Sequence, residues 1–550
     1  MRVLGINALY HDPAAALVVD GQTVAATEEE RFSRRKHGKR PVPFAAWELP
    51  ELAARWCLQR GGLRVEDLDA VTYSFDPALR LPPEQLGVMD PWDDLRQQYA
   101  LRAPDFLADA LPGLDPAQVR FVAHHVAHAA SCGLAAPFGG NTAVLVLDGR
   151  GERHSHLAGE FQGGRLETLY SQTLPHSLGL LYEDATQHLG FLRSSDEFKV
   201  MALASYGKPR HLSYLRELVH ADGQGGFVTA GVDWNTMAKQ RQADEAWGPE
   251  HADLACSLQA VLEEVLLELS QWLHQQTGNP NLTLAGGVAL NCVANTRIVR
   301  DGPFDNVWVQ PAAGDAGTAL GGAMYAGQSG GDSIAQFPGA DLGREWSDQE
   351  IENVLQTARI TYHRPDDIAA AVAETLAADG IVAWFQGRSE YGPRALGHRS
   401  LLAHPGRETN LQRLNDVKGR EQFRPVAPMV LAERAAQLFS GGPIPSPYML
   451  FVHDVAPQWK DRIPAVVHVD GTARIQTVDR GDEPLVARML TLFEQRTGLP
   501  VVVNTSLNTA GRPMVDTPAE ALECFGSTPI DLLAIGPFAV RRAMPCGPMP

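Results

Sequence analysis

The stretch TAVLVLDGRGE at residues 142–152 decides the fold, because it joins an apolar strand to a polar turn. Ala143–Leu147 predicts the strand, and the turn opens with Asp148-Gly149. The alternating run Ser155–Phe161 follows, and Gly163-Gly164 leads into another strand. Asp-Gly and Gly-Gly pairs between such runs are typical of hairpins. We therefore expect a strand, a polar turn and a hairpin, in this order.

The same unit occurs near the start of the chain. Val3–Asn7 predicts a short strand, His11-Asp12-Pro13 a polar turn, and Ala15–Val19 and Thr23–Thr27 two further strands joined at Asp20-Gly21. Two copies of one strand–turn–hairpin unit predict a duplicated α/β domain of the actin and hexokinase type. Such a domain binds its ligand between the two halves.

The composition is that of a globular protein with an acidic balance. There are 47 Lys and Arg against 65 Asp and Glu, a net charge of −18, and such a field repels a nucleic-acid backbone. The six cysteines are scattered without a C-x-x-C pair, which counts against a thiolate metal site. The sequence shows no apolar run long enough to cross a bilayer and no secretory signal. We expect a soluble cytoplasmic protein with neither nucleic acid nor membrane as a partner.

The length of 550 residues favours two or three domains. Ala326–Leu342 is rich in Gly, Ser, Asp and Pro and is typical of a linker. Ser347-x-x-Glu350 then matches a capping box that opens a helix. We therefore expect one domain at 1–345 and a second at 346–550.

Two stretches, 78–105 and 218–250, have weak periodicity with scattered Pro, Gly and Trp. We interpret them as loop-rich insertions, which often shape a substrate pocket.

Four residues form a candidate metal site. His124 and His128 lie four apart in Val122–Ala136, a stretch of good helix formers, so both imidazoles share one helical face. The same spacing also occurs on ordinary solvated or hydrogen-bonded helix faces. Asp148 and Asp315 follow predicted strands at positions where α/β proteins present ligands. A His2Asp2 set without sulfur suits iron(II), manganese or zinc and leaves open positions for a substrate.

A glycine pair is a candidate nucleotide contact in the first domain. Gly286-Gly287 follows the predicted strand Leu282–Ala285 and leads to Asn291. Paired glycines let backbone N–H groups approach a nucleotide closely. The same turn is also common for packing alone, and both interpretations stay open.

The second domain contains a cluster of basic residues. Eight of them, against four acidic residues, lie between Arg388 and Arg424. Arg394 and Arg399 lie in a loop with several glycines, where guanidinium groups can match phosphate oxygens. Farther along, the strand Val501–Val503 delivers polar groups into a turn that could bind a phosphate or a carbonyl group. A solvated basic rim with ordinary turns is the alternative.

Taken together, these segments resemble the O-carbamoyltransferase family that includes the nodulation-factor, cephamycin, ansamycin and tobramycin carbamoyltransferases. The matching segments occur in one order along nearly the whole chain. They are His11-Asp12, His124–Ala129, Leu147–Gly149, Lys199–Met201, Gly286–Asn291, Gly314-Asp315, Gly392–Ser400, Lys418–Pro425, His468–Arg474 and Asn504–Asn508.

The resemblance implies two linked catalytic domains. The first is similar to the actin-like protein that transfers threonylcarbamoyl to tRNA, and the second to the synthase that makes threonylcarbamoyl-adenylate. By this resemblance, the second domain makes carbamoyl-adenylate from carbamoyl phosphate and ATP, with Mg2+. The first, metal-dependent domain then transfers the carbamoyl group to a hydroxyl of a small natural product, such as an antibiotic or another secondary metabolite. A homodimer is the assembly that the family suggests.

The resemblance also assigns residues. The metal positions, for which Fe2+ is the expected ion, are His124, His128, Asp148 and Asp315. The nucleotide positions of the first domain are Gly286, Gly287 and Asn291. The ATP and carbamoyl-phosphate positions are Arg394, Arg399, Lys418, Arg424, Arg474, Asn504 and Ser506. His11 is our candidate to orient or deprotonate the acceptor hydroxyl. His398 stands where the family has Asn, a departure that could alter nucleotide contacts.

Three alternatives remain. A tRNA-modifying enzyme of the threonylcarbamoyl type uses the same two-part chemistry, but the net charge of −18 counts against it. A sugar kinase would fit the actin-like half but has no use for a His2Asp2 site. A nucleotide-gated scaffold or chaperone would bind ATP without releasing pyrophosphate when carbamoyl phosphate is added.

Overall fold

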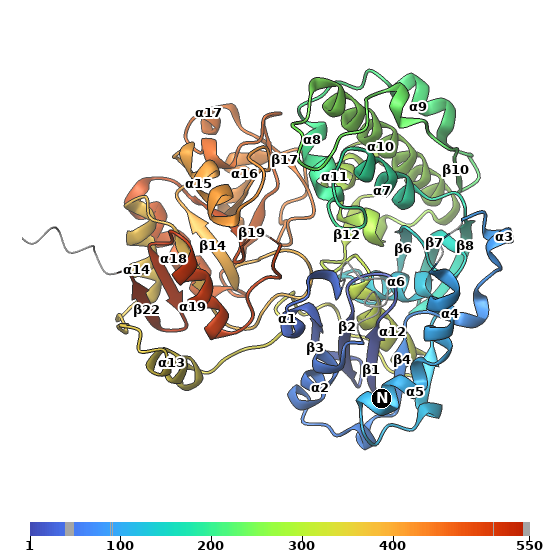
Figure 1. Ribbon diagram of the computed structural model, residues 1–550, viewed down its shortest axis with the longest axis horizontal. Helices are drawn as coiled ribbons and strands as arrows, with labels where there is room; N and C mark the ends of the chain where they lie inside the picture. The colour runs from blue at the N-terminus through green and yellow to red at the C-terminus, as the bar shows by residue number, and fades with distance from the viewer. Residues whose placement is uncertain (39–48, 89, 91, 510, 543–550) are drawn as a thin grey trace, which may run out of the picture. The chain divides into compact units, whose positions relative to one another are not determined.

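The computed structural model describes residues 1–38, 49–88, 90, 92–509 and 511–542 (Figure 1). The chain divides into two compact units, Met1–Gly339 and Ala340–Pro550. The second unit thus begins slightly before the boundary predicted from composition. The linker is also shorter than predicted, because helix α12 (Ala316–Ser329) continues through its first residues. Within the described residues, every helix is too short or too polar to span a membrane.

The first unit contains two five-stranded sheets with one topology. Their strand orders are β3-β2-β1-β4-β5 and β8-β7-β6-β11-β12. In each sheet the first three strands along the chain form an antiparallel meander, and two parallel strands extend the other edge. This repetition confirms the predicted duplicated α/β fold of the actin and hexokinase type.

The strands within 2–28, 142–173 and 281–285 match segments predicted from the sequence, whereas the other strands of the first unit were not predicted. The full set is β1 (Arg2–Asn7), β2 (Ala14–Val19), β3 (Gln22–Glu28), β4 (Ala70–Tyr73), β5 (Val119–Phe121), β6 (Thr142–Leu147), β7 (His154–Gln162), β8 (Arg165–Thr173), β9 (Val219–Ala221), β10 (Phe227–Thr229), β11 (Asn281–Ala285) and β12 (Asn306–Val309). The pair β9–β10 forms a small separate sheet within the predicted insertion 218–250.

The helices of the first unit include one correction to the sequence analysis. Besides α12, they are α1 (Glu30–Ser33), α2 (Glu51–Arg60), α3 (Pro83–Leu86), α4 (Asp93–Leu101), α5 (Ala103–Ala110), α6 (His124–Gly133), α7 (Leu178–His188), α8 (Glu197–Ala204), α9 (Leu212–Leu218), α10 (Pro249–Thr277) and α11 (Cys292–Asp301). The stretch 78–105 is therefore largely helical rather than loop-rich. Its helices are short and several of their contacts are ion pairs, which apolar periodicity does not detect.

Close packing fixes the spacing of α6 and α12. A Cβ added at Gly321 of α12 would lie 1.8 Å from the carbonyl oxygen of Ala127 on α6, so only glycine permits this approach. The segments that carry the predicted metal ligands are thereby held at a short, fixed separation.

The second unit is built on a seven-stranded mixed sheet of order β19-β15-β20-β14-β13-β21-β22, with a separate sheet β16-β17-β18. Its strands are β13 (Val382–Phe385), β14 (Arg399–Ala403), β15 (Ala427–Leu431), β16 (Phe439–Ser440), β17 (His453–Val455), β18 (Thr472–Ala473), β19 (Gln476–Val478), β20 (Val501–Ser506), β21 (Leu532–Ile535) and β22 (Phe538–Arg541). Its helices are α13 (Asp348–Thr357), α14 (Ile368–Ala377), α15 (Thr409–Lys418), α16 (Ala432–Leu438), α17 (Pro457–Lys460), α18 (Pro484–Thr497) and α19 (Pro518–Ser527). Ser347 caps α13 through the predicted capping box.

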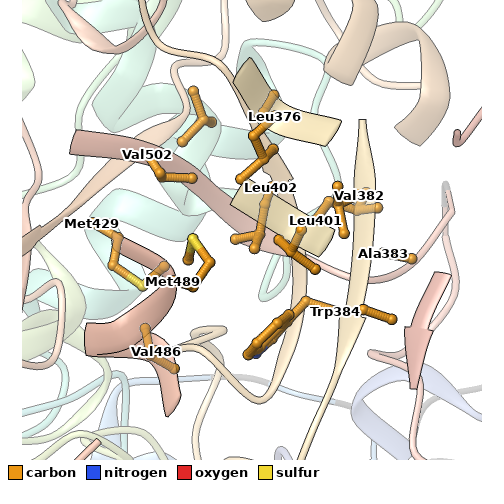
Figure 2. Close-up of a cluster of buried hydrophobic side chains, with 14 of the residues drawn as sticks. Leu376, Val382, Ala383, Trp384, Leu401, Leu402, Met429, Val486, Met489 and Val502 are labelled. Atoms are coloured by element: carbon orange, nitrogen blue, oxygen red, sulfur yellow. The ribbon is translucent and has the colours of Figure 1, made fainter. Parts of the chain in front are cut away.

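The core of the second unit supports the loop that carries the predicted anion-binding arginines. Side chains of β13, β14 and β20, among them Trp384, Leu402 and Val502, pack together with those of α14 and α18 (Figure 2). The indole nitrogen of the buried Trp384 donates to the carbonyl oxygen of Gly397 at 2.7 Å. The core therefore holds the end of the 386–398 loop directly.

Candidate functional site

Four side chains that the sequence predicts as metal ligands meet in one buried cluster of the first unit. His124 and His128 lie one turn apart on α6, Asp148 follows β6, and Asp315 precedes α12. The Nε2 atoms of the two histidines lie 3.1 and 3.7 Å from Asp148 Oδ2, and 3.7 and 3.6 Å from Asp315 Oδ1. One ligand atom of each residue lies within 4.8 Å of every other. The cluster therefore has the dimensions of a site for one cation.

The residues present fit a divalent metal ion. The buried ring of His128 has no hydrogen-bond partner at either nitrogen within the described part of the chain. A buried polar group without a partner is costly, and coordination of an ion would remove this cost. Asp148 Oδ1 accepts the backbone N–H of Gly287 at 2.9 Å, which orients the carboxylate and leaves Oδ2 toward the histidines. Imidazole nitrogen with carboxylate oxygen is a donor set for iron(II), manganese or zinc.

The electrostatics also match a cation site. Burial disfavours the charged imidazole of His124, but the hydrogen bond to Asp148 and the charge of Asp315 outweigh it and raise the pKa of His124 to about 9. Although burial acts in the opposite direction, the adjacent imidazoles hold the pKa of Asp148 well below its usual range. Two carboxylates thus create a buried centre that strongly favours positive charge.

Glu152, which sequence reasoning missed, holds the start of the metal-site helix. Its Oε1 accepts the backbone N–H groups of His124 and Asp76, both at 2.8 Å. These contacts satisfy an N–H at the N-terminus of α6 that has no partner within the helix. Burial raises the pKa of Glu152. Its place in the polar turn after Asp148 was the one indication of its role in the sequence.

His11 belongs to a second cluster, together with Asp12 and His37. Its Nδ1 lies 2.7 Å from Asp12 Oδ2, and His37 Nδ1 lies 2.7 Å from Asp12 Oδ1. The other ring nitrogen of His11 lies 2.5 Å from the carbonyl oxygen of Ser194. A carboxylate oxygen and a carbonyl oxygen thus lie at the two ring nitrogens of His11, and both nitrogens are engaged. The contacts favour an orienting role for His11 over deprotonation. No motif surrounds His37, and the sequence analysis did not find it.

The predicted nucleotide residues Gly286, Gly287 and Asn291 have structural contacts of their own. A Cβ at Gly286 would lie 2.1 Å from the carbonyl oxygen of Leu147, so the turn presses against the end of β6. Gly287 holds Asp148, as described above. Asn291 caps α11 through the N–H of Ala294 at 3.0 Å. These contacts account for the glycine pair without a ligand, and nucleotide binding there stays a prediction.

In the second unit, Lys418 ends α15 and reaches the turn after β20. Its buried ammonium donates to Ser506 Oγ at 2.9 Å and also to Asn508 Oδ1. On the same strand, the amide of Asn504 donates to the carbonyl oxygen of Ala395 at 3.1 Å, next to Arg394. The structure thus brings Lys418, Ser506 and Asn504 together beside the arginine loop.

Three further arginines, Arg420, Arg424 and Arg474, lie close enough for their charges to interact. Burial and the charges of Arg424 and Arg474 lower the pKa of the Arg420 guanidinium to about 9. Arg424 lies 3.3 Å from Glu421, and Arg474 Nε is buried without a hydrogen-bond partner within the described residues. Such a concentration of like charge in a buried region is unfavourable unless an anion joins it.

Arg399 differs from the other predicted phosphate contacts. Its side chain is fully buried on β14, and its terminal nitrogens donate to the carbonyl oxygens of Gln386 at 2.7 Å, Arg344 at 3.0 Å and Gly387 at 3.1 Å. The guanidinium also lies 3.8 Å above the ring of Phe385. These contacts favour a role in positioning the loop over direct phosphate contact.

Glu390 organises the same loop, and sequence reasoning counted it only as one of the acids. Its Oε1 accepts the backbone N–H groups of Leu396, His398 and Arg399 at 2.7, 3.0 and 3.2 Å. The ring of His398 is held by Glu483 at 2.9 Å. A carboxylate that accepts three backbone N–H groups holds the end of the loop that presents Arg394.

Comparison with protein-family models decides the family. A model described as the carbamoyltransferase N-terminus matches residues 2–79 and 106–324, and one described as the carbamoyltransferase C-terminus matches residues 373–542. The chain belongs to the carbamoyltransferase family. It is accordingly a transferase enzyme, and the sequence-based family prediction is confirmed.

Two nodulation proteins are similar to this carbamoyltransferase over nearly its whole length. The chain is 36% identical to nodulation protein NolNO of Sinorhizobium fredii over 98% of its own length and 80% of that protein. It is 31% identical to nodulation protein U of the same organism, over 95% and 96% of the two chains. Among solved structures, HypF of T. kodakarensis is similar at 15% identity with a TM-score of 0.32, over 60% of this carbamoyltransferase and 49% of that chain.

Proposed function

We propose that this carbamoyltransferase makes carbamoyl-adenylate from ATP and carbamoyl phosphate in its second unit, and transfers the carbamoyl group to a hydroxyl of a small molecule in its first unit. The proposal rests chiefly on the buried His2Asp2 cluster of the first unit. Its four ligand atoms lie within 4.8 Å of one another, and its residues lie in the part of the chain that the carbamoyltransferase N-terminus model matches. The proposed acceptor is a natural product such as an antibiotic or another secondary metabolite.

Carbamoyl-adenylate formation is assigned to the cationic cluster of the second unit. Lys418 and Arg474, together with Arg394 and Arg424, would bind the phosphate oxygens of ATP and carbamoyl phosphate. Water attacks the phosphorus of carbamoyl phosphate, the bond between this phosphorus and the carbamoyl oxygen breaks, and inorganic phosphate leaves carbamate behind. A carbamate oxygen then bonds to the α-phosphorus of ATP, and the bond from this phosphorus to the bridging oxygen breaks as pyrophosphate leaves. Buried positive charges stabilise the negative charge that builds up on these oxygens. Asn504 and Arg399 keep the loop in place, as their contacts with carbonyl oxygens indicate.

Transfer is assigned to the first unit. The acceptor oxygen bonds to the carbamoyl carbon, the bond between this carbon and the AMP oxygen breaks, and the hydroxyl proton passes to a base. His124, His128, Asp148 and Asp315 would hold the cation, for which we propose Fe2+. When bound, such an ion supplies Lewis-acid stabilisation of charge on a phosphate or carbonyl oxygen. His11 would orient the reacting groups, and Gly286, Gly287 and Asn291 would lie against the nucleotide.

The decisive test is an assay of pyrophosphate release by the full-length protein with ATP, with and without carbamoyl phosphate. We expect release only when both are present, and mass spectrometry should show labelled carbamoyl on a member of a panel of polyhydroxylated metabolites. His11→Ala should lower transfer and leave pyrophosphate release unchanged. Near-normal transfer by this variant would exclude the role given to His11. Absence of pyrophosphate release with both substrates would exclude the proposed function.

A further inference from the structure

His37 shares the carboxylate of Asp12 with His11. One oxygen of this carboxylate, Oδ2, lies 2.7 Å from His11 Nδ1, and the other, Oδ1, lies 2.7 Å from His37 Nδ1. The centroids of the two imidazole rings are 4.5 Å apart, and the rings are tilted by 37°. The carboxylate therefore joins two rings that come from separate segments of the chain.

The turn that carries this cluster also contacts a residue of the metal site. The ring of Tyr10 meets the ring of His124 edge-on, with 6.2 Å between centroids. The side chains of His11, Asp12 and His37 are 23%, 24% and 20% exposed, so solvent reaches all three. The cluster is thus linked to the metal site through one residue and is accessible to a small molecule.

The main chain is held on both sides of the contact between Asp12 and His37. The side-chain amide of Asn7 donates to the carbonyl oxygens of His11 at 2.8 Å and Asp12 at 3.0 Å. The backbone N–H of His37 donates to Glu30 Oε2 at 2.9 Å. Asp12 and His37 both have left-handed backbones, with φ of 45° and 58°, a conformation that costs free energy in residues other than glycine. Local contacts thus fix the place where the carboxylate and the imidazole meet.

The contact with Asp12 is the feature that explains the place of the His37 ring. The other ring nitrogen of His37, Nε2, is buried and has no hydrogen-bond partner within the part of the chain that the structure describes. Although burial acts in the opposite direction, the adjacent imidazoles hold the pKa of Asp12 well below its usual range, so its carboxylate is ionised. An ionised carboxylate that is held in place fixes the ring of His11 at Nδ1, and with it the direction of His11 Nε2.

We propose that His37 is a positioning residue for carbamoyl transfer: it holds the carboxylate of Asp12, which in turn holds the ring of His11. The inference rests on the proposed function, because it needs the orienting role given to His11 in the first unit. His37 acts through these two residues and contacts neither the carbamoyl donor nor the acceptor.

The test compares two variants that differ in where they place an amide nitrogen. In His37→Asn this nitrogen takes the place of Nδ1 and can donate to Asp12, whereas in His37→Gln it takes the place of Nε2 and cannot. We expect His37→Gln to lower the kcat of carbamoyl transfer about tenfold, the effect of one hydrogen bond to a charged group, and His37→Asn to stay within about threefold of the wild type. Transfer is measured by mass spectrometry with ATP, labelled carbamoyl phosphate and a panel of sugars, inositols and aminosugars.

A double variant shows whether His37 acts through His11. His37→Gln should cause no further loss of transfer when it is added to His11→Ala, because the ring that His37 positions is already absent. A purely structural role of His37 would instead lower transfer by the same factor in both backgrounds. The matched control is His220→Gln, at an exposed histidine of the same unit, which should leave transfer unchanged.

Equal transfer by His37→Asn and His37→Gln, or a further loss of about tenfold in the double variant, overturns the inference. Unfolding of His37→Gln under the assay conditions, measured by thermal denaturation, also overturns it, because the residue then serves stability. Pyrophosphate release separates this claim from the proposed function, since the second unit carries out that reaction. Release at the wild-type level in each variant, with transfer changed as expected, supports the inference. Absence of release by the wild-type protein overturns the proposed function, and the role of His37 with it.

Discussion

The two candidate sites are opposites in charge and in how they are supported. In the first unit, two carboxylates and two imidazoles converge, and Asp148 is held by the N–H of Gly287. In the second unit, a lysine and several arginines converge, and the carboxylate of Glu390 holds the backbone of the loop that presents one of them. The first arrangement attracts a cation and the second attracts anions. One chain thus carries a site with the chemistry of a cation site and a site with the chemistry of an anion site, and the proposed two-step transfer assigns one step to each.

The largest expected effect is a loss of function at the first site that leaves the second site unchanged. Asp148→Asn removes a negative ligand from the buried cluster, so bound metal and carbamoyl transfer should each fall about 100-fold or more. Pyrophosphate release should remain, because the second unit is unchanged. Metal content measured by elemental analysis and the two activity assays check this. Asp184→Asn, at an exposed residue of the same unit, is the control. Loss of both activities in the Asp148 variant would contradict the division of labour.

Lys418→Met tests the opposite site. Removal of a buried cation that would face phosphate oxygens should lower carbamoyl-dependent pyrophosphate release about 100-fold. Metal content should stay at the wild-type level. Arg496→Met, on the exposed face of α18, is a control that removes a cation without touching the cluster. A fall in metal content with normal pyrophosphate release would reverse the assignment of the two sites.

Glu197 allows a comparison within the first unit, because it is an acid that does not belong to the metal cluster. Burial raises its pKa from 4.5 to about 7. Between pH 4.5 and 7, the Glu197 carboxyl is ionised in the unfolded chain but still protonated in the folded protein. The free energy of unfolding therefore falls as the pH rises from 4.5 to 7, and it stays reduced above pH 7. Glu197→Gln should therefore be more stable than the wild type by about 3 kcal/mol at pH 8 and not at pH 4.5. Urea unfolding at the two pH values measures this difference, and an equal effect at both would contradict it.

The smallest expected effect concerns Glu390, the acid that supports the cationic site. Glu390→Gln keeps the shape but removes the charge that strengthens three hydrogen bonds, so the free energy of unfolding should fall by about 1 kcal/mol. Chemical denaturation checks this, with Glu408→Gln at an exposed position as the control. An unchanged stability would mean that the loop does not depend on this carboxylate.

Local pattern predicted the first unit well. The two strand–turn–hairpin units are readable because apolar runs and Asp-Gly turns are local features, and the ligands His124 and His128 are four apart on one helix. The pairing of β6 with β11 is not local, so the sequence could not show that Gly287 supports Asp148. His37 and Glu152 were missed for the same reason, since their partners lie far away in the sequence.

The second unit was harder to predict. The density of basic residues pointed to anion binding, but counting charges cannot separate an arginine that faces a ligand from one that is saturated by carbonyl oxygens. Arg399 is of the second kind, and only its contacts reveal this. Burial of the guanidinium is set by the fold of the loop, which is fixed in turn by Trp384 and Glu390.

The close contact of Gly321 with Ala127 has a consequence for metal selectivity. Because the backbones already touch, the helices can neither draw nearer for a small ion nor gain a side chain there that would hold them apart for a large one. The separation of the two helices that carry three of the four proposed ligands is therefore fixed by their main chains. Exchange of a ligand side chain would change the donor and its reach, but the separation of the two helices would stay the same.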